Sequence, residues 1–319
     1  MDKKIIFVTG GAGFIGSNYL NIFVPKYPNE TFVNIDALTY AADLKNISIS
    51  DAPNYIFEKA DIRDREIIEE LFKKYSPTHI VHFAAESHVD LSITNPHLFV
   101  ETNVNGTHNL LFLAKKYGTK RFLQVSTDEV YGDLNAHDPA FTENSPIAPN
   151  SPYSASKAAA EFLARSYWKT FGLEVVITRC SNNYGPNQDD TKLIPLFIKK
   201  LLAGEQVPLY GEGKNVRDWL HVSDHVEAID LVLRTGKADE VYNIGGNYEV
   251  ENIEITKKLI ALAGRDETAI DRVTDRLGHD FRYAIDSSKI QRELGWKPKH
   301  SFEAGLNETF EWFKKKNIK

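Results

Sequence analysis

Short apolar runs alternate with amphipathic stretches along the first part of the chain. The apolar runs predict six strands: Ile5–Thr9, Thr31–Asp36, Tyr55–Lys59, His79–Phe83, Arg121–Ser126 and Glu174–Arg179. Helix-like periodicity separates most of them, as at Arg65–Tyr75 and Asn105–Lys116. Strands that are apolar on both faces are typical of a parallel sheet covered by helices on each side. We therefore predict an α/β fold with a doubly wound parallel sheet.

Beyond about residue 180 the rhythm changes, and prolines and glycines punctuate the chain. Three further helices are predicted at Leu193–Ala203, Ile253–Ala263 and Phe302–Lys315, with short strands at Val207–Tyr210 and Glu240–Ile244. This pattern predicts a smaller, mixed α/β C-terminal domain. We expect the sheet domain to span 1–180 with about 216–246, and the second domain to span 181–215 and 247–319.

The composition is that of a globular protein. The 319 residues are 42% hydrophobic and 26% charged, with a net charge of −6 and no long basic block, which argues against a nucleic-acid partner. Cys180 is the one cysteine, so no intrachain disulfide can form and a reducing, cytoplasmic location is expected. No apolar stretch approaches the roughly 20 residues that cross a bilayer. We expect no membrane association.

The first strand runs directly into a glycine loop, Gly10–Gly16, which precedes a helical segment. Glycines let the backbone approach a pyrophosphate, and the helix N-terminus then offers free N–H donors to the anion. Asp36 ends the next strand, 20 residues after Gly16. A carboxylate there accepts hydrogen bonds from ribose hydroxyls and repels a 2′-phosphate. The pattern therefore predicts a Rossmann-type domain that binds NAD rather than NADP.

Two other residue pairs each admit two interpretations. Asp61 and Ile62 follow the third strand, and this segment either borders the adenine or caps the following helix; the two roles are compatible. His221 and His225 have a spacing that can bind zinc on a helix, but no clear third ligand follows. We interpret Asp224 and His225 as structural and expect no metal.

A tyrosine and a lysine lie four residues apart after Ser151-Pro152, a typical helix opening. Tyr153 and Lys157 are thereby one turn apart on one helix face. A cationic lysine favours the phenolate, so we expect the pKa of Tyr153 to fall towards neutrality, as suits a base for a sugar or alcohol hydroxyl. The same spacing also occurs on solvated helices and does not decide the role alone.

The fifth predicted strand ends in a polar cluster. Ser126 and Thr127 supply hydroxyls, and Asp128 and Glu129 supply two acids. Ligands of open α/β sheets bind beyond the carboxyl ends of the strands. Either hydroxyl could therefore donate a hydrogen bond to a substrate oxygen at a hydride-transfer site.

Several segments together resemble a known family. GGAGFIG, the acidic strand end, YSASK, SNNYGP and RDWLHVSDH are similar to the extended short-chain dehydrogenase/reductase family of nucleotide-sugar enzymes. Within that family, STDEVYG resembles the dTDP-glucose 4,6-dehydratases, because similar sugar epimerases usually lack the acid pair. The resemblance covers essentially the whole chain.

The resemblance implies a reaction on dTDP-glucose with a retained NAD. Tyr153 would deprotonate the sugar 4-hydroxyl during hydride transfer from C4, Lys157 would hold the phenolate and the nicotinamide ribose, and Thr127 would bind the developing ketone. Glu129 would then remove the C5 proton, while Asp128 protonates the departing 6-hydroxyl. Hydride return to C6 would leave dTDP-4-keto-6-deoxyglucose, a deoxysugar precursor.

Three questions stay open at the level of sequence. Neighbouring residues of a strand point to opposite faces, so Asp128 and Glu129 can both face a sugar only if a turn or bulge follows Thr127. A nucleotide-sugar 4-epimerase or decarboxylase is the near alternative. A non-catalytic NAD-binding sensor is an alternative of another class, although a binding role does not need Thr127, Tyr153 and Lys157 together.

The resemblance also implies binding residues and a homodimer. The expected cofactor contacts are Gly10, Gly13, Phe14, Ile15, Gly16, Asp36, Ala37, Leu38, Thr39, Asp61, Ile62, Phe83, Ala84, Ala85, Thr102, Tyr153, Lys157 and Asn183. The expected nucleotide-sugar contacts are Ser87, Thr127, Asn182, Lys192, Leu193, Pro208, Leu209, Tyr210, Arg217, Asn252, Arg276, His279 and Tyr283. Among these, Lys192 and Arg217 suit a pyrophosphate. The helical stretches Asn95–Lys116 and Ser154–Phe171 are candidates for the dimer interface.

Overall fold

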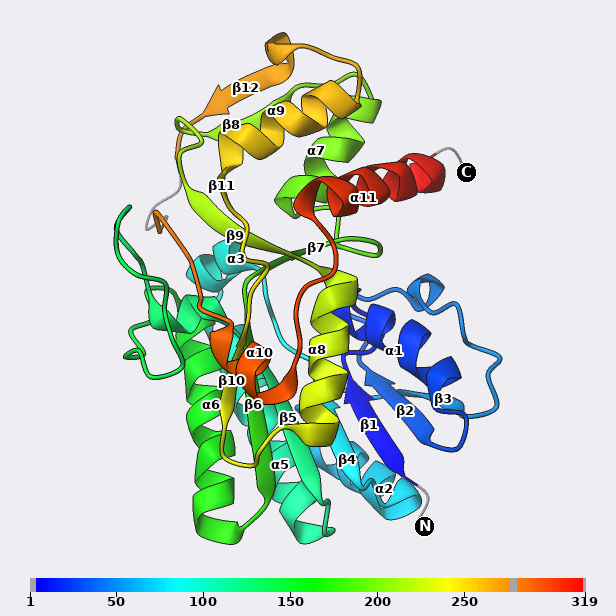
Figure 1. Ribbon diagram of the computed structural model, residues 1–319. Coiled ribbons are helices and arrows are strands. Elements are labelled where there is room, and N and C mark those ends of the chain that lie inside the picture. The colour runs from blue at the N-terminus through cyan, green and yellow to red at the C-terminus, as the bar shows by residue number, and fades with distance from the viewer. Residues whose placement is uncertain (1–3, 276–279, 318–319) are drawn as a thin grey trace.

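A seven-stranded parallel sheet forms the larger part of the molecule (Figure 1). The computed structural model describes residues 4–275 and 280–317. The strand order is β10-β6-β5-β4-β1-β2-β3. The strands are β1 (Ile5–Thr9), β2 (Thr31–Asp36), β3 (Tyr55–Lys59), β4 (His79–His82), β5 (Arg121–Thr127), β6 (Glu174–Cys180) and β10 (Val241–Ile244). The predicted doubly wound sheet is confirmed, and the strand predicted at Glu240–Ile244 forms its edge.

Helices cover both faces of this sheet. One face packs against α1 (Phe14–Lys26), α8 (Val222–Thr235) and α10 (Ser288–Leu294), and the other against α2 (Arg65–Tyr75), α5 (Thr107–Lys116) and α6 (Pro152–Phe171). Each face has its own core of fully buried aliphatic and aromatic side chains. This double burial explains why the strands lack polar alternation.

The helix predicted from Asn105 starts two residues later, at Thr107. Before it come α3 (Val89–Thr94), α4 (Pro96–Phe99) and a π-helical segment, η2 (Val100–Gly106). Asn103 lies in η2, and its side chain accepts from the N–H of Glu86 (2.8 Å) and donates to the C=O of Glu86 (3.0 Å). These two bonds attach η2 to the segment that follows β4.

A second, smaller group of elements lies beyond the carboxyl ends of the sheet strands (Figure 1). Its core is enclosed by α7 (Leu193–Leu202), α9 (Asn252–Leu262) and α11 (Phe302–Asn317). Its strands are β7 (Asn182–Tyr184), β9 (Val216–His221) and β11 (Glu249–Glu251) in one sheet, and β8 (Val207–Tyr210) and β12 (Ile270–Val273) in another. Short 3-10 turns are η1 (Leu44–Asn46), η3 (Asp128–Tyr131) and η4 (Glu267–Ala269).

The second group has the predicted mixed α/β character, whereas the domain boundaries themselves stay a prediction. β9 pairs with β7 and β11, although the segment 216–246 was assigned to the sheet domain from sequence. Within residues 4–275 and 280–317, the helices are all too short or too polar to cross a membrane.

Candidate active site

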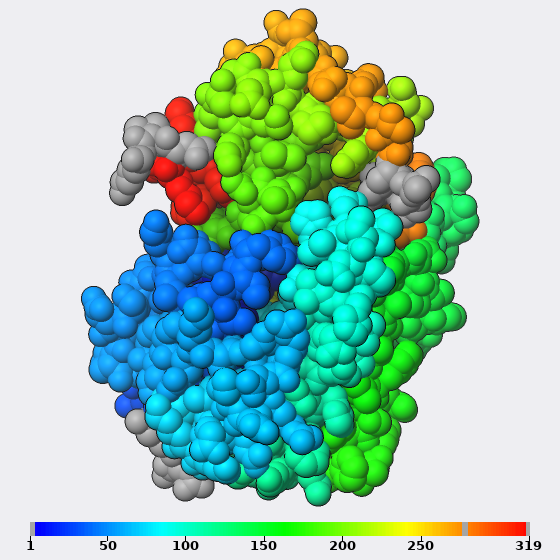
Figure 2. All heavy atoms as spheres, turned by 180° about the vertical axis from the view of Figure 1, so that it is seen from behind, coloured from blue at the N-terminus to red at the C-terminus, as the bar shows by residue number. Residues whose placement is uncertain are grey.

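A pocket of about 330 Å³ opens at the carboxyl ends of the sheet strands. Its walls come from the ends of β1, β2, β4 and β5, from the start of α6, and from the segment between β6 and α7. Figure 2 shows the molecular surface hollowed between the blue and cyan parts of the chain. The pocket therefore occupies the position at which open α/β sheets bind their ligands.

The glycine loop forms one end of the pocket and is shaped by close backbone approaches. Gly10 has a φ of +72°, and a Cβ there would lie 2.6 Å from the backbone nitrogen of Ala84. A Cβ at Gly16 would lie 2.3 Å from the carbonyl oxygen of Gly10. Because Gly13 precedes α1 and has no side chain to cap it, the first N–H groups of the helix face the pocket uncapped. This cradle fits a pyrophosphate.

Asp36 fixes the turn that follows β2. It is 6% exposed, and its carboxylate accepts from the backbone N–H groups of Ala12 (2.9 Å) and Leu38 (2.8 Å). Burial raises its pKa, and these two hydrogen bonds oppose the rise. The carboxylate thus connects the glycine loop to the loop after β2 while lining the pocket.

Asp61 lines the same pocket, but it does not cap α2. Its carboxylate forms a salt bridge with Arg63 (2.6 Å), and the helix is capped by Asp64, which accepts from the N–H of Ile67 (3.1 Å). The helix begins at Arg65, so the proposed cap at Asp61 is wrong. The other predicted role of Asp61, bordering the adenine of the cofactor, stays a prediction.

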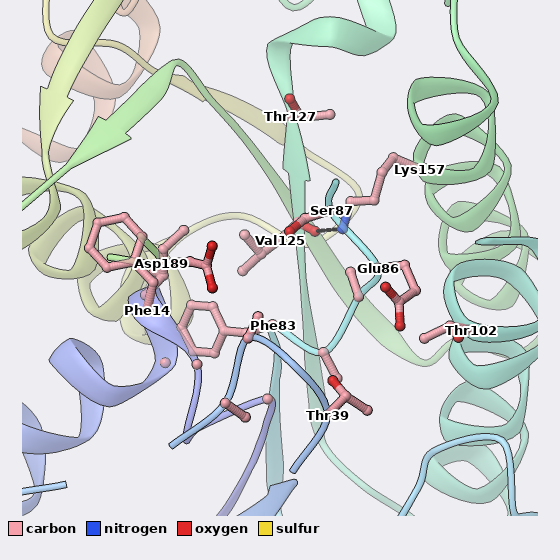
Figure 3. Close-up of a pocket in the computed structure, with 18 of the residues that line it drawn as sticks. Phe14, Thr39, Phe83, Glu86, Ser87, Thr102, Val125, Thr127, Lys157 and Asp189 are labelled. Carbon is pink, nitrogen blue, oxygen red and sulfur yellow. Dashed lines mark hydrogen bonds between the residues drawn. The ribbon is translucent and has the colours of Figure 1, made fainter. Parts of the chain in front are cut away.

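Helix α6 begins as its sequence predicts. Ser151 is the N-cap, Pro152 follows it, and Ser151 and Ser154 form a reciprocal capping box with N–H to Oγ distances of 3.1 Å. This opening directs Tyr153 and Lys157 into the pocket. Figure 3 shows Lys157 reaching from α6 to the backbone of β5, where its ammonium donates to the Val125 carbonyl (2.7 Å).

The expected pKa of Tyr153 is wrong in direction. Burial raises the pKa well above its usual value, and the Glu129 carboxylate and Cys180 raise it further, against a hydrogen bond from the Thr127 hydroxyl. Burial also lowers the pKa of Lys157 to about 8. The Lys157 ammonium is directed to a backbone carbonyl and not to the phenol. Desolvation therefore outweighs the attraction between ammonium and phenolate in setting the pKa of Tyr153.

Asp128 and Glu129 lie on a turn, which is the geometry that both side chains need in order to face one substrate. Thr127 ends β5 and caps η3; its hydroxyl accepts from the N–H of Glu129 and donates to Asp128 Oδ1, each at 3.3 Å. Asp128 is 3% exposed, and burial followed by the charges of Glu129 and Asp218 raises its pKa well above the usual range. Both acids line the pocket. The environment therefore favours a protonated Asp128.

The structure brings most of the predicted residues into this one pocket. All five candidate catalytic residues line it, together with every expected cofactor contact except Leu38. Of the expected nucleotide-sugar contacts, Ser87, Thr127, Asn182 and Lys192 line it. Lys192 also donates to the carbonyl of Ser87 (3.1 Å).

Other expected substrate contacts lie outside the pocket walls. Seven described residues are absent from the lining: Leu193, Pro208, Leu209, Tyr210, Arg217, Asn252 and Tyr283. Arg217 is buried, lies over the Tyr283 ring at 4.4 Å and donates to backbone carbonyls of residues 216, 280 and 281. Arg276 and His279 lie outside the described residues. These roles stay predictions.

The two histidines make separate contacts. His225 hydrogen-bonds through Nδ1 to Asn183 (2.8 Å), and the His221 ring lies against that of His300 with centroids 4.2 Å apart and planes tilted by 32°. Burial lowers the pKa of both, to about 3 for His225 and about 4 for His221. Across the described parts of the chain, no cluster of three or more His, Cys, Asp or Glu side chains is arranged to hold a metal ion.

Sequence reasoning missed several residues of the pocket wall. Among them are Tyr40, Glu86 and Cys180, each next to a predicted segment. Glu86 is 6% exposed and its Oε2 has no hydrogen-bond partner among the described residues. The available signal was an acidic residue directly after the apolar run Phe83–Ala85.

Comparisons with known proteins identify the family of this chain. A family model described as GDP-mannose 4,6 dehydratase matches residues 7–309, nearly the whole chain. The chain belongs to this family. Its curated relatives include the dTDP-glucose 4,6-dehydratase of Haemophilus influenzae, 47% identical over 97% of each chain. A second such dehydratase, from Xanthomonas campestris, is 49% identical over 96% of this chain and 92% of its own. The resemblance seen in the sequence is thereby confirmed.

Solved structures of dTDP-glucose 4,6-dehydratases have the same fold as this chain. The dTDP-glucose 4,6-dehydratase of Bacillus anthracis, in complex with NAD, superposes with a TM-score of 0.92 at 50% identity and covers 99% of this chain and 98% of its own. The enzyme of the same name from Streptomyces venezuelae gives 0.94 at 47% identity, covering 98% of each chain. A UDP-glucose 4-epimerase of Thermotoga maritima superposes with a TM-score of 0.92 but is only 32% identical, covering 98% of this chain and 99% of its own. The fold is thus shared with epimerases, whereas the sequence is closer to the dehydratases.

Proposed function

We propose that the protein is a lyase that dehydrates dTDP-glucose to dTDP-4-keto-6-deoxyglucose with a retained NAD. One observation carries the proposal: the buried Asp128 and its neighbour Glu129 share a pocket with Thr127, Tyr153 and Lys157. An oxidation at C4 needs only Thr127, Tyr153 and Lys157. The acid pair supplies the proton donor and acceptor that removal of water across C5 and C6 requires.

The pocket fits NAD at several points. The glycine cradle and the N-terminus of α1 suit the pyrophosphate, and the Asp36 carboxylate suits the ribose hydroxyls. When bound, the nicotinamide would supply the hydride chemistry, taking up hydride from C4 of the sugar and delivering it to C6. Phe83, Ala84 and Ala85 would lie along it from the end of β4.

The chain's own groups divide the acid–base work by environment. Thr127 donates to the oxygen at C4, and Tyr153 takes the proton from that hydroxyl. Burial and Glu129 raise the pKa of Tyr153, so the phenol first has to release its own proton to water, and the phenolate so formed is a strong base for the sugar hydroxyl. Lys157 holds its position through Val125.

The subsequent elimination uses the acid pair. Glu129 takes the proton from C5, which a C4 ketone acidifies. Asp128 gives its proton to the departing 6-hydroxyl, in keeping with the raised pKa of its carboxyl. Two neighbouring carboxyls thus act as base and acid because only one of them is deeply buried.

A mass-labelling experiment tests this function. The purified protein is incubated with dTDP-glucose in heavy water without added NAD, and the product is analysed by mass spectrometry. We expect the product to have lost one water and to have gained one deuterium at C5. A product of unchanged mass in ordinary water would instead indicate epimerisation, and bound NAD without turnover would indicate a non-catalytic sensor. UDP-, CDP- and GDP-glucose in parallel test the choice of base.

We further propose a cytoplasmic homodimer. The buried, unpaired Cys180 suits a reducing compartment. Helices α5 and α6 expose apolar side chains, Phe112 at 38% and Phe162 at 58%. Light scattering should give twice the 36.1 kDa of one chain, and Phe162→Glu should shift the protein towards monomer. A monomeric wild-type protein would exclude the dimer.

A further inference from the structure

A buried ion pair lies behind the pocket, between α6 and β6. The Arg179 guanidinium donates to the Glu161 carboxylate through Nη2 (2.6 Å) and through Nε, which lies 3.1 Å from both oxygens. The two side chains are only 6% and 3% exposed. Burying two charges costs desolvation energy that apolar packing would not, so such a pair is weak evidence for stability and better evidence for a required geometry.

Glu161 occupies the helix face that enters the pocket. It lies one turn beyond Lys157 and two turns beyond Tyr153 on α6. Arg179 is the residue before Cys180 on β6, and in register it lies between Ser126 of β5 and Asn243 of β10. The ion pair therefore attaches the helix that carries Tyr153 and Lys157 to β6, the strand next to the β10 edge of the sheet.

A third arm of the same guanidinium reaches the acid pair's turn. Arg179 Nη1 donates to the Tyr131 hydroxyl (2.8 Å), which in turn donates to Asn243 Oδ1 (2.8 Å). Tyr131 is the last residue of η3, the turn that begins with Asp128 and Glu129. Its ring stacks on Phe141 with centroids 4.9 Å apart and planes at 17°.

We propose that Tyr131 is a positioning residue for the elimination step, which rests on the function proposed above. Through Arg179 and Glu161 it holds the Asp128–Glu129 turn at a fixed distance from the Tyr153–Lys157 face of α6. Without the Tyr131 hydroxyl, the far end of η3 keeps its packing but loses its hydrogen bonds to Arg179 and Asn243. Thr127, Tyr153 and Lys157 are held by β5 and α6 and keep their places.

The test separates the two half-reactions in Tyr131→Phe. We expect water loss and deuterium entry at C5 to slow about tenfold or more, as for a small misplacement of reacting groups. Reduction of the nicotinamide and the KM for dTDP-glucose should change less than about twofold. Reduced cofactor should therefore accumulate during a single turnover, seen by its near-ultraviolet absorbance.

Tyr242→Phe is the matched control. Tyr242 is also fully buried and hydrogen-bonded, but its ring belongs to the core against α8, on the opposite sheet face from its neighbour Asn243. We expect it to keep both rates. Should Tyr131→Phe fail to fold, Phe141→Leu, which removes the ring stacked on Tyr131, should give the same imbalance between the two rates.

The outcomes distinguish the two proposals. Elimination at the wild-type rate in the variant, or equal slowing of both half-reactions, would overturn the positioning role. Absence of water loss from the wild-type protein would instead refute the proposed function.

Discussion

At the scale of single residues, burial decides which acid carries the proton. Asp128 has a raised pKa because it is buried beside Glu129 and near Asp218. Its Oδ2 has no hydrogen-bond partner among residues 4–275 and 280–317, although it lies at the pocket wall. A protonated carboxyl there can give its proton to a leaving oxygen.

The two acids should therefore fail differently when changed. Glu129→Gln removes the proposed base and should lower both C5 exchange and dehydration by roughly 10²–10⁴-fold. Asp128→Asn should lower water loss to a similar extent while C5–H exchange with solvent persists. Product mass and C5 deuterium measure the two steps separately, and cofactor content serves as the control for folding. Wild-type kcat in both variants would show that the assigned roles are wrong.

Lys157 should carry a cost in stability that depends on pH. Its pKa is about 8 in the folded protein, against an ordinary value of 10.5. The unfolded chain therefore binds more protons between these two values, so the wild-type free energy of unfolding rises as pH increases through this window.

Replacing Lys157 by Met should reveal that cost. At pH 7 the variant should be inactive yet more stable than wild type by about 1–2 kcal/mol, after allowance for the lost bond to the Val125 carbonyl. The difference in the free energy of unfolding between variant and wild type should shrink as pH rises from about 8 towards about 10. Urea unfolding across pH measures it. A variant less stable than wild type at pH 7 would contradict the explanation.

At the scale of elements, the opening of α6 controls the direction of Tyr153. The capping box of Ser151 and Ser154 satisfies N–H groups that the first turn leaves unpaired. Ser151→Ala should lower the free energy of unfolding by about 1 kcal/mol. Urea denaturation gives the stability, and kcat gives the accompanying loss of activity. An unchanged midpoint would mean that other contacts fix this end of the helix.

Elements that obey local rules could be predicted, and those set by distant contacts could not. The glycine loop and the Ser-Pro opening follow from backbone freedom and capping, so sequence sufficed. The π-helical segment is bonded through Asn103 to Glu86, 17 residues away, and this contact is not visible in the local sequence. The direction of the Tyr153 pKa shift depends on tertiary burial, which the Tyr–Lys spacing alone does not reveal.

At the scale of the whole molecule, the pocket lies between two bodies that the chain enters more than once. After forming β7 and α7 beyond the sheet, the chain returns through α8 and β10 before leaving again at β11. The residues to which we assign hydride transfer come from the sheet body, whereas Asn182 and Lys192 of the pocket wall come from the segment that leaves it. The division into a cofactor domain and a nucleotide-sugar domain stays a prediction, and the pairing of β9 with β7 and β11 was not predicted from sequence.

The late return of β10 has a consequence for synthesis on the ribosome. Ile177–Cys180 of β6 pair with Val241–Ile244, more than sixty residues later. At about 5–20 residues per second, β6 stays an open edge for roughly 3–13 seconds. A nascent chain stalled in that interval presents an apolar strand edge to its neighbours. A fragment ending at Cys180 should therefore aggregate, as sedimentation would reveal, whereas one extended through α8 and β10 should aggregate less.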